Sequence, residues 1–279
     1  MRHQLVIVLD LGGRHNQLIA RRIRACGVYC EVRPYTTPLE ELKTLAPIGI
    51  ILIGGPGSVW EAGAPRVDPA LFTLGLPVLG VGYGCQVMAC ALGGDVTAAA
   101  EGAAGEYDKS ETFYDGDCAL FKGLPAHGLS YMSQGDEMTG APEGCSVVAR
   151  TQTYPIAAIA DAARSFYGVQ FHPEVGHTEN GMDMIRNFLF GVCKAVGDWD
   201  MADYLKDSVS ALRERIGDRK VLLALSGGVD SSVCAALLDR AVGEQLTCIF
   251  VDHGLLRKHE GDDVAAAFAG KRVKFVRVD

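Results

Sequence analysis

A histidine and a glutamate two residues apart, His172 and Glu174, follow an apolar run typical of a buried strand. In an extended backbone such a pair lies on one face, so it suits a general base and the carboxylate that orients it. Far upstream, residues 80–84 have the glycine spacing of a nucleophile elbow, a tight strand-to-helix turn. Its central residue is Gly82, which has no nucleophilic side chain.

A second segment, SGGVDSS, has the composition of a phosphate-binding loop between a strand and a helix. Its glycines let the backbone curl so that N–H groups point at phosphate oxygens, and the following helix adds a favourable dipole. The serines add hydroxyl donors, and the Asp230 carboxylate suits Mg²⁺ bound to a phosphate group. There is no Gly-Lys-Ser/Thr, so the loop is not of the Walker type. The candidate phosphate-binding residues of this loop are Ser226, Gly227, Gly228, Val229, Asp230, Ser231 and Ser232.

Short apolar runs that alternate with helical stretches predict the elements that position both groups. Continuous apolar strands with crossover helices are typical of a parallel sheet covered on both faces, where ligands bind at the carboxyl ends of strands. Shorter runs between residues 93 and 171 predict antiparallel strands at the edge of the same domain. The expected strands are 5–9, 28–32, 48–53, 77–81, 146–149, 157–160, 166–171, 221–225, 246–251 and 273–278; the expected helices include 16–24, 85–92, 181–196 and 233–242, with a linker at 198–205.

Composition excludes several classes of protein. The chain has 279 residues, 48% of them hydrophobic, and a net charge of −8, which argues against disorder and against a general nucleic-acid or membrane-surface binder. No apolar run reaches the roughly 18–20 residues of a membrane span, and the N-terminal run is too short for a signal peptide. The nine cysteines include no C-x-x-C pair, so we expect free thiols in a reducing cytoplasm.

The N-terminal part resembles the class I glutamine amidotransferases over nearly all of residues 1–195. The resemblance lies in residues 10–24, 54–59, 77–86, 131–136 and 167–178, the last reading YGVQFHPEVGHT. It implies that His172 is the base and Glu174 its orienting residue. It also implies that the glutamine and its oxyanion are bound by Gly55, Gly57, Tyr83, Gln86 and Ser133.

The family has a cysteine nucleophile where this chain has Gly82, so a glutamyl thioester cannot form there and no glutaminase activity is expected. Other positions also differ: Gln134 replaces a family histidine, Arg14 stands where the family has glutamine, and residues 105–108 depart from the Arg-Glu-Tyr/Phe-Gly stretch. Cys85, three residues after the elbow centre, is expected to pack in the core rather than to substitute. Arg21, Arg22 and Arg24 are expected on a solvated helix face.

SGGVDSS resembles the loop of the ATP pyrophosphatases, and the order of the two parts resembles the GMP synthetases, as do residues 250–257. The resemblance implies an α/β chain with an amidotransferase-like domain at 1–197, a linker and helix at 198–219, and the truncated start of a PP-loop domain at 220–279. It implies glutamine, XMP and ATP with Mg²⁺ as substrates and counter-ion, with the homodimerisation domain of the family missing.

The leading hypothesis is therefore a GMP synthetase-like ligase chain that forms GMP, AMP and pyrophosphate from XMP, ATP and glutamine or ammonia, inactive alone or part of an ammonia-dependent enzyme. One alternative is a regulatory module that binds glutamine without hydrolysing it. A different PP-loop enzyme, such as a tRNA-modifying one, would explain the second part alone. The sequence lacks the basic stripe that RNA binding would require, which argues against this alternative.

Overall fold

The computed structural model describes residues 3–13, 15–55, 57–98, 109–133 and 135–278. The chain divides into two compact units, Met1–Trp199 and Asp200–Asp279, which are described separately. Within the described ranges, no helix combines the length and apolar character needed to cross a membrane.

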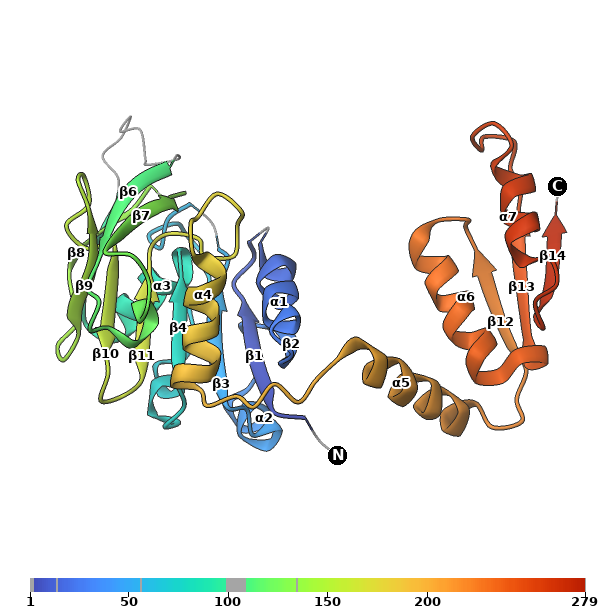
Figure 1. The fold of residues 1–279 in the computed structure, drawn as a ribbon, viewed down its shortest axis with the longest axis horizontal. Helices are drawn as coiled ribbons and strands as arrows, with labels where there is room; N and C mark the ends of the chain where they lie inside the picture. Colours follow the sequence, from blue (N-terminus) through green and yellow to red (C-terminus); the bar gives the residue numbers. More distant parts are fainter. Residues whose placement is uncertain (1–2, 14, 56, 99–108, 134, 279) are drawn as a thin grey trace. The chain divides into compact units, whose positions relative to one another are not determined.

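The first unit is built on a nine-stranded sheet with the order β2-β1-β3-β4-β11-β10-β9-β6-β7 (Figure 1). Neighbouring strands from β2 to β11 are parallel, and those from β11 to β7 are antiparallel. A separate antiparallel pair consists of β5 and β8. The strands are β1 (Leu5–Asp10), β2 (Tyr29–Pro34), β3 (Gly49–Ile53), β4 (Val78–Val81), β5 (Asp95–Thr97), β6 (Lys109–Tyr114), β7 (His127–Tyr131), β8 (Glu137–Gly140), β9 (Ser146–Thr151), β10 (Ala158–Asp161) and β11 (Phe166–Val169).

Helices cover both faces of the parallel part, because alternate residues of each strand point to opposite faces. Val6 and Val8 of β1 share a core with α1 (Asn16–Ala25) and α4 (Gly181–Arg186), which continues as a π-helical turn, Asn187–Val192. Leu5, Ile7 and Leu9 share the other core with α2 (Leu39–Leu45) and α3 (Tyr83–Ala91). Short 3-10 turns span Pro69–Thr73 and Ala119–Phe121.

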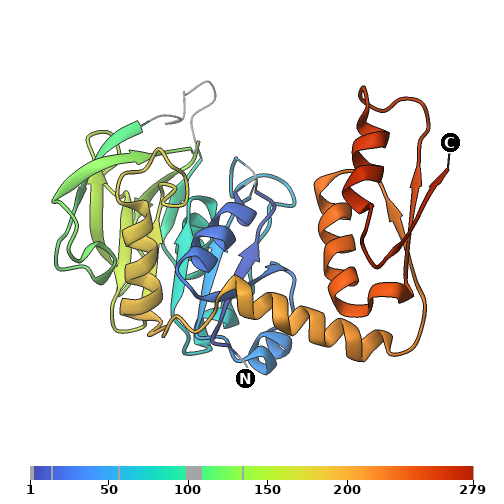
Figure 2. The same ribbon diagram turned by 45° about the vertical axis from the view of Figure 1, so that its right-hand side comes forward.

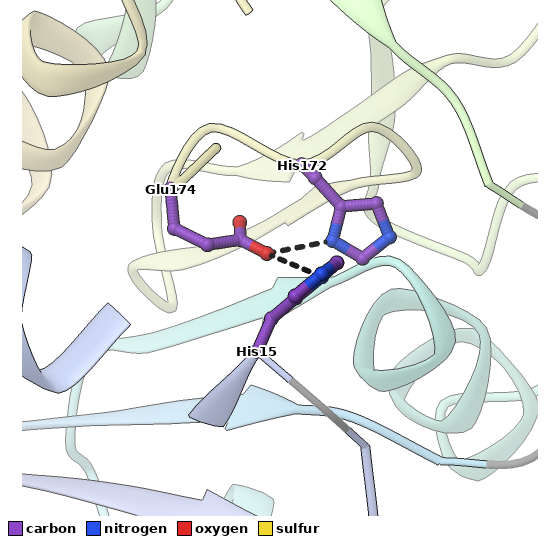
Figure 3. A group of neighbouring side chains, drawn as sticks. All are labelled: His15, His172 and Glu174. Carbon is purple, nitrogen blue, oxygen red and sulfur yellow. Dashed lines mark hydrogen bonds and ion pairs between the residues drawn. The ribbon is translucent and has the colours of Figure 1, made fainter. Parts of the chain in front are cut away.

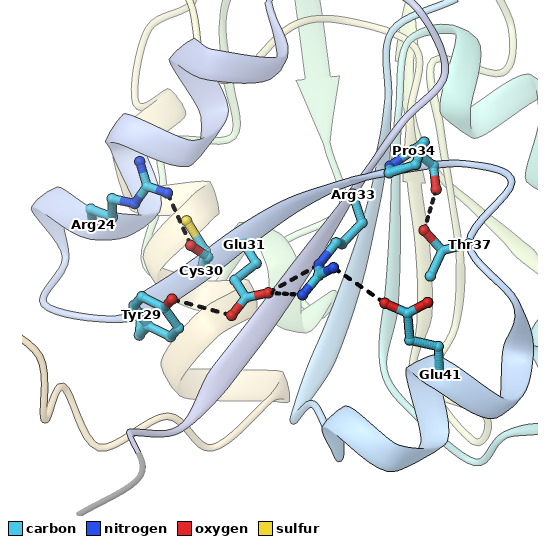
Figure 4. Close-up of polar contacts among 8 residues, drawn as sticks. All are labelled: Arg24, Tyr29, Cys30, Glu31, Arg33, Pro34, Thr37 and Glu41. Carbon is cyan, nitrogen blue, oxygen red and sulfur yellow. Dashed lines mark hydrogen bonds and ion pairs between the residues drawn. The ribbon is translucent and has the colours of Figure 1, made fainter. Parts of the chain in front are cut away.

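The edge strand β2 carries a network of charged and polar contacts (Figure 4). Arg33 pairs with Glu31 of the same strand at 2.6 Å and with Glu41 of α2 at 3.2 Å. Arg24 of α1, expected on a solvated face, is half-buried and donates to the carbonyl oxygen of Cys30 at 3.0 Å. Charges on an edge strand discourage pairing with another chain.

In the second unit, drawn in orange and red in Figure 2, three parallel strands follow the order β12-β13-β14. Side chains of α6 and α7 share one core with these strands. The strands are β12 (Val221–Leu225), β13 (Leu246–Val251) and β14 (Lys274–Val278). The helices are α5 (Met201–Ile216), α6 (Val229–Val242) and α7 (Glu260–Phe268), with a 3-10 turn at Gly243–Gln245.

The predicted α/β architecture, a mainly parallel sheet with an antiparallel edge and a smaller α/β part, is confirmed.

Several boundaries differ from the prediction. α5 begins inside the predicted 198–205 linker, because the Asp200 side chain caps it by accepting from the Asp203 N–H at 2.8 Å. α5 belongs to the second unit and packs against α6, since Arg213 donates to the carbonyl oxygen of Ala241 at 2.9 Å. Strand β11 is parallel to β4 and antiparallel to β10, so it joins the two parts of the sheet.

Candidate active site

Gly82 occupies the turn between β4 and α3 with the backbone angles of an elbow. Its φ is +55° and its ψ is −119°, a region that residues with a side chain rarely adopt. Its N–H donates to the carbonyl oxygen of Val169 at 2.9 Å. A Cβ atom added to Gly82 would lie 3.0 Å from Cε1 and 3.1 Å from Nε2 of His172. A side chain at residue 82 would thus face the imidazole of His172 directly.

His172 and Glu174 form the pair expected from their spacing. Nδ1 of His172 lies 2.8 Å from Oε1 of Glu174, and His15 places its own Nδ1 3.4 Å from the same oxygen (Figure 3). The hydroxyl of Thr178 donates to the His172 carbonyl oxygen at 2.6 Å. With Nδ1–H donating to Glu174, Nε2 of His172 is left as the basic nitrogen that faces Gly82.

Glu174 is fully buried, which by itself would raise the pKa of its carboxyl group. Hydrogen bonds from His15 and His172, together with the charge of His172, outweigh the burial and lower the pKa of Glu174 to about 2. The main chain of Glu174 is also held, because Nε of Arg22 donates to its carbonyl oxygen at 3.0 Å. Glu174 is therefore a fixed carboxylate at neutral pH.

Two of the residues predicted to bind the oxyanion, Gly55 and Tyr83, pack against each other beside the elbow. Gly55 has a φ of +130°, and a Cβ atom there would overlap the Tyr83 ring, so only glycine fits. Tyr83 is the first residue of α3, and its N–H therefore has no acceptor within the helix. Gly57 is exposed and Ser133 is half-buried in the neighbouring loops. The backbone arrangement is compatible with stabilising a developing oxyanion.

Gln86, predicted to hold glutamine, is 1% exposed and contacts protein groups. Its Nε2 donates to the main-chain oxygen of Asp136 at 3.0 Å. The Asp136 carboxylate in turn accepts from the Ser58 hydroxyl at 2.7 Å and from the Val59 N–H at 2.9 Å. In the structure Gln86 therefore ties α3 to the loop that precedes β8.

Cys85 points away from the elbow into the core. It is fully buried, and a Cβ atom on Gly168 of β11 would lie 2.6 Å from its sulfur. Burial raises the pKa of the Cys85 thiol, which disfavours the reactive thiolate. All nine cysteines are free.

The sequence interpretation missed His15 and the contact made by Arg22. The signal for His15 was available, since it follows β1, and the carboxyl ends of the parallel strands of a sheet lie at the same edge. Arg22, expected on a solvated face, is half-buried and also donates to the Glu174 carbonyl oxygen, a contact that the expectation did not include. The predicted departures at Arg14, Gln134 and residues 105–108 lie outside the described residues.

The SGGVDSS segment forms a loop and the first turn of α6. Gly227 has a φ of +82°, and Gly228 is the residue before the helix. The hydroxyls of Ser226 and Ser231 lie 3.0 Å apart, and the Ser232 hydroxyl donates to the Gly228 carbonyl oxygen at 2.8 Å. Val229 and Asp230 are exposed in the first turn. The loop thus presents an exposed helix N-terminus, a geometry suited to a phosphate group.

Comparisons with known proteins agree with both parts. Residues 7–192 match the family model for glutamine amidotransferase class-I, and residues 200–270 match the model for asparagine synthase. GMP synthase [glutamine-hydrolyzing] from Finegoldia magna is 48% identical over 279 residues, which is 100% of this chain and 54% of that protein. The protein of the same name from Agathobacter rectalis is 50% identical over 283 residues, or 100% of this chain and 53% of that one. The chain spans about half the length of these relatives.

A solved structure of a GMP synthase subunit from Thermoplasma acidophilum has a TM-score of 0.60 and 27% identity to this chain. The match covers 74% of this chain and 98% of that one. The family-model match extends over most of the first unit and over more than half of the chain. The chain therefore belongs to the glutamine amidotransferase class-I family.

Proposed function

We propose that this chain is the amidotransferase and ATP-binding portion of a GMP synthase-type ligase whose glutamine pocket lacks its nucleophile. The names of the relatives support the overall reaction, in which ATP adenylates XMP and ammonia displaces AMP to give GMP. Those relatives are about twice as long. We therefore propose the ligase reaction for a protein that contains this chain together with a counterpart of the remaining half of these relatives.

The observation that carries this proposal is that residue 82, which faces the imidazole of His172, has no side chain. In the covalent route a sulfur attacks the carboxamide carbon of glutamine, the C–N bond breaks, and the leaving ammonia takes a proton from the histidine. Here Nδ1 of His172 and Oε1 of Glu174 lie 2.8 Å apart, whereas residue 82 offers no atom beyond its backbone. Nitrogen for the amination then comes from free ammonia.

In the second unit, we propose that the loop from Ser226 to Ser232 binds the pyrophosphate of ATP and that Asp230 holds the accompanying Mg²⁺. The exposed N-terminus of α6 and the clustered hydroxyls support this assignment. Carboxylate oxygens suit Mg²⁺, which binds proteins through few such groups and the phosphates of its substrate.

Ammonia release from L-glutamine by the native chain tests the first unit, with Cys85→Ser as the matched variant. We expect no release above the rate without protein, in both chains. Release that disappears in Cys85→Ser would contradict the proposal, because it would assign the nucleophile to a thiol that the structure buries.

A second function, glutamine binding without hydrolysis, is favoured by the preserved elbow angles of Gly82 and the close packing of Gly55 on Tyr83. Calorimetry with L-glutamine, and with D-glutamine as control, distinguishes the two. Binding of the L-isomer without ammonia release supports a regulatory pocket. Absence of binding contradicts the regulatory role and leaves the ligase proposal intact.

A further inference from the structure

A second histidine lies on the carboxylate that His172 already uses. His15 comes from the loop between β1 and α1, whereas His172 and Glu174 follow β11, and Figure 3 shows both imidazoles pointing at one oxygen of Glu174. One donor atom from each of the three residues lies within 4.8 Å of the other two. A general base and its orienting carboxylate need only one imidazole, so the arrangement exceeds what that role requires.

The carboxylate between the histidines is incompletely satisfied. Glu174 is 0% exposed, and within the described part of the chain its Oε2 atom has no hydrogen-bond partner. A buried carboxylate oxygen without a partner is costly, and a bound cation offsets that cost. The histidines face Oε1, so a cation between them also becomes the partner of Oε2 when the carboxylate binds it through both oxygens.

We propose that His15, His172 and Glu174 bind a divalent transition-metal ion of the zinc type. Two imidazole nitrogens and one carboxylate oxygen are a donor set that holds Zn²⁺ and leaves a fourth position for water. With metal–ligand bonds of about 2.0–2.1 Å, tetrahedral ligand atoms lie about 3.4 Å apart. The observed separations from Oε1 of Glu174 are 2.8 Å and 3.4 Å, and the three donor atoms all lie within 4.8 Å of one another, so side-chain rotations are needed to bring them to that spacing.

The main chain of each ligand is held by further contacts. Arg22 donates to the Glu174 carbonyl oxygen, Thr178 donates to that of His172, and the carbonyl oxygen of His15 accepts the first hydrogen bonds of α1. Such outer contacts preorganise a metal site. The positive end of the α1 dipole opposes a cation, but a full charge on a buried carboxylate in contact with it outweighs a partial charge.

A metal ion on Nδ1 of His172 replaces the hydrogen bond from that atom to Glu174. Metal binding and the base role of His172 are thus alternatives. The metal proposal does not depend on glutamine chemistry, and its failure would leave the proposed function unaffected.

The test is titration of Zn²⁺ into the metal-free native chain in competition with a chromophoric chelator, with Co²⁺ as a spectroscopic probe. We expect one Zn²⁺ per chain and a visible Co²⁺ spectrum of a four-coordinate nitrogen and oxygen site. His15→Gln should weaken Zn²⁺ binding by at least the 10- to 100-fold that the loss of an outer contact costs. His127→Gln is the matched control, since His127 also faces a carboxylate, that of Glu111 at 3.1 Å, outside this cluster.

Equal Zn²⁺ affinity in the native chain, His15→Gln and His127→Gln would overturn the proposal. So would a Co²⁺ spectrum dominated by near-ultraviolet thiolate bands, because those would assign the ion to cysteines such as the exposed Cys234. If His15→Gln does not fold by circular dichroism, His172→Gln decides, and it must lose Zn²⁺ binding to the same extent.

Discussion

Replacing Gly82 by cysteine changes both the strain in the elbow and its chemistry. A residue with a side chain at φ +55° and ψ −119° costs about 1–3 kcal/mol. The new Cβ atom also lies 3.0 Å from Cε1 of His172, so the ring must move by a few tenths of an ångström. We expect the free energy of unfolding of Gly82→Cys to fall by about 1–3 kcal/mol. At roughly 2–4 °C per kcal/mol for a domain of this size, Tm falls by about 2–12 °C.

Gly82→Ala is the matched control, because it has the same Cβ atom and strain but no sulfur. Thermal unfolding should show similar losses for both variants, whereas only Gly82→Cys should release ammonia from L-glutamine in a coupled assay. His172→Gln in the Gly82→Cys background should abolish that release, since the thiol then has no base.

Two results would refute this reasoning separately. If Gly82→Ala is as stable as the native chain, the backbone angles at residue 82 do not impose the expected strain on a residue with a side chain. If Gly82→Cys is folded but hydrolyses no glutamine, the nucleophile is not the only missing group, and the sequence departures at Gln134 and Arg14 become the next positions to restore.

Three further predictions concern other parts of the chain. Gly55→Ala should lower the free energy of unfolding by about 2–4 kcal/mol in denaturant titrations, because its φ is +130° and a neighbouring ring fills the space; an unchanged midpoint would show that the ring can move. Burial raises the pKa of Asp161, but hydrogen bonds from Arg164 outweigh it and leave the pKa below the usual value. The carboxylate therefore stabilises the fold above the unfolded-state pKa, and this contribution is lost as the pH falls toward the folded-state pKa. Asp161→Asn should thus be less stable at pH 7, and its difference from the native chain in urea unfolding should shrink below about pH 4; a constant difference would contradict this. Ser231→Ala should weaken pyrophosphate binding about tenfold in calorimetry by loosening the loop, while Cys234→Ser on the same helix should not; equal losses would argue against a specific loop contact.

The order and type of the main elements could be predicted because buried strands and amphipathic helices leave a periodic pattern. Boundaries set by local hydrogen bonds could not. α6 begins at Val229 rather than at residue 233. The Ser232 N–H and hydroxyl both donate to the Gly228 carbonyl oxygen, so the polar segment forms the first turn of the helix. The same serines had indicated a loop.

The site was predictable where its residues are adjacent in sequence and not where folding brings them together. The spacing of His172 and Glu174 is sufficient to place both side chains on one face, and they lie 2.8 Å apart. Arg22 reaches the main chain of Glu174 from 152 residues away, and no periodicity marks a contact with a carbonyl group. His15 joins the cluster only because β1 and β11 end at the same edge of the sheet.

Both proposals for the first unit involve His172, each through a different ring nitrogen. Nε2 faces Gly82, where the absence of a side chain removes the group that a base would activate. Nδ1 faces Glu174, where His15 brings a second imidazole nitrogen to 3.4 Å from the same oxygen. An imidazole whose Nδ1 carries a proton for Glu174 is a base through Nε2, and one whose Nδ1 coordinates a metal ion is not. The loss of a nucleophile on one side therefore removes the need to keep Nδ1 protonated, which frees this histidine to act as a metal ligand on the other.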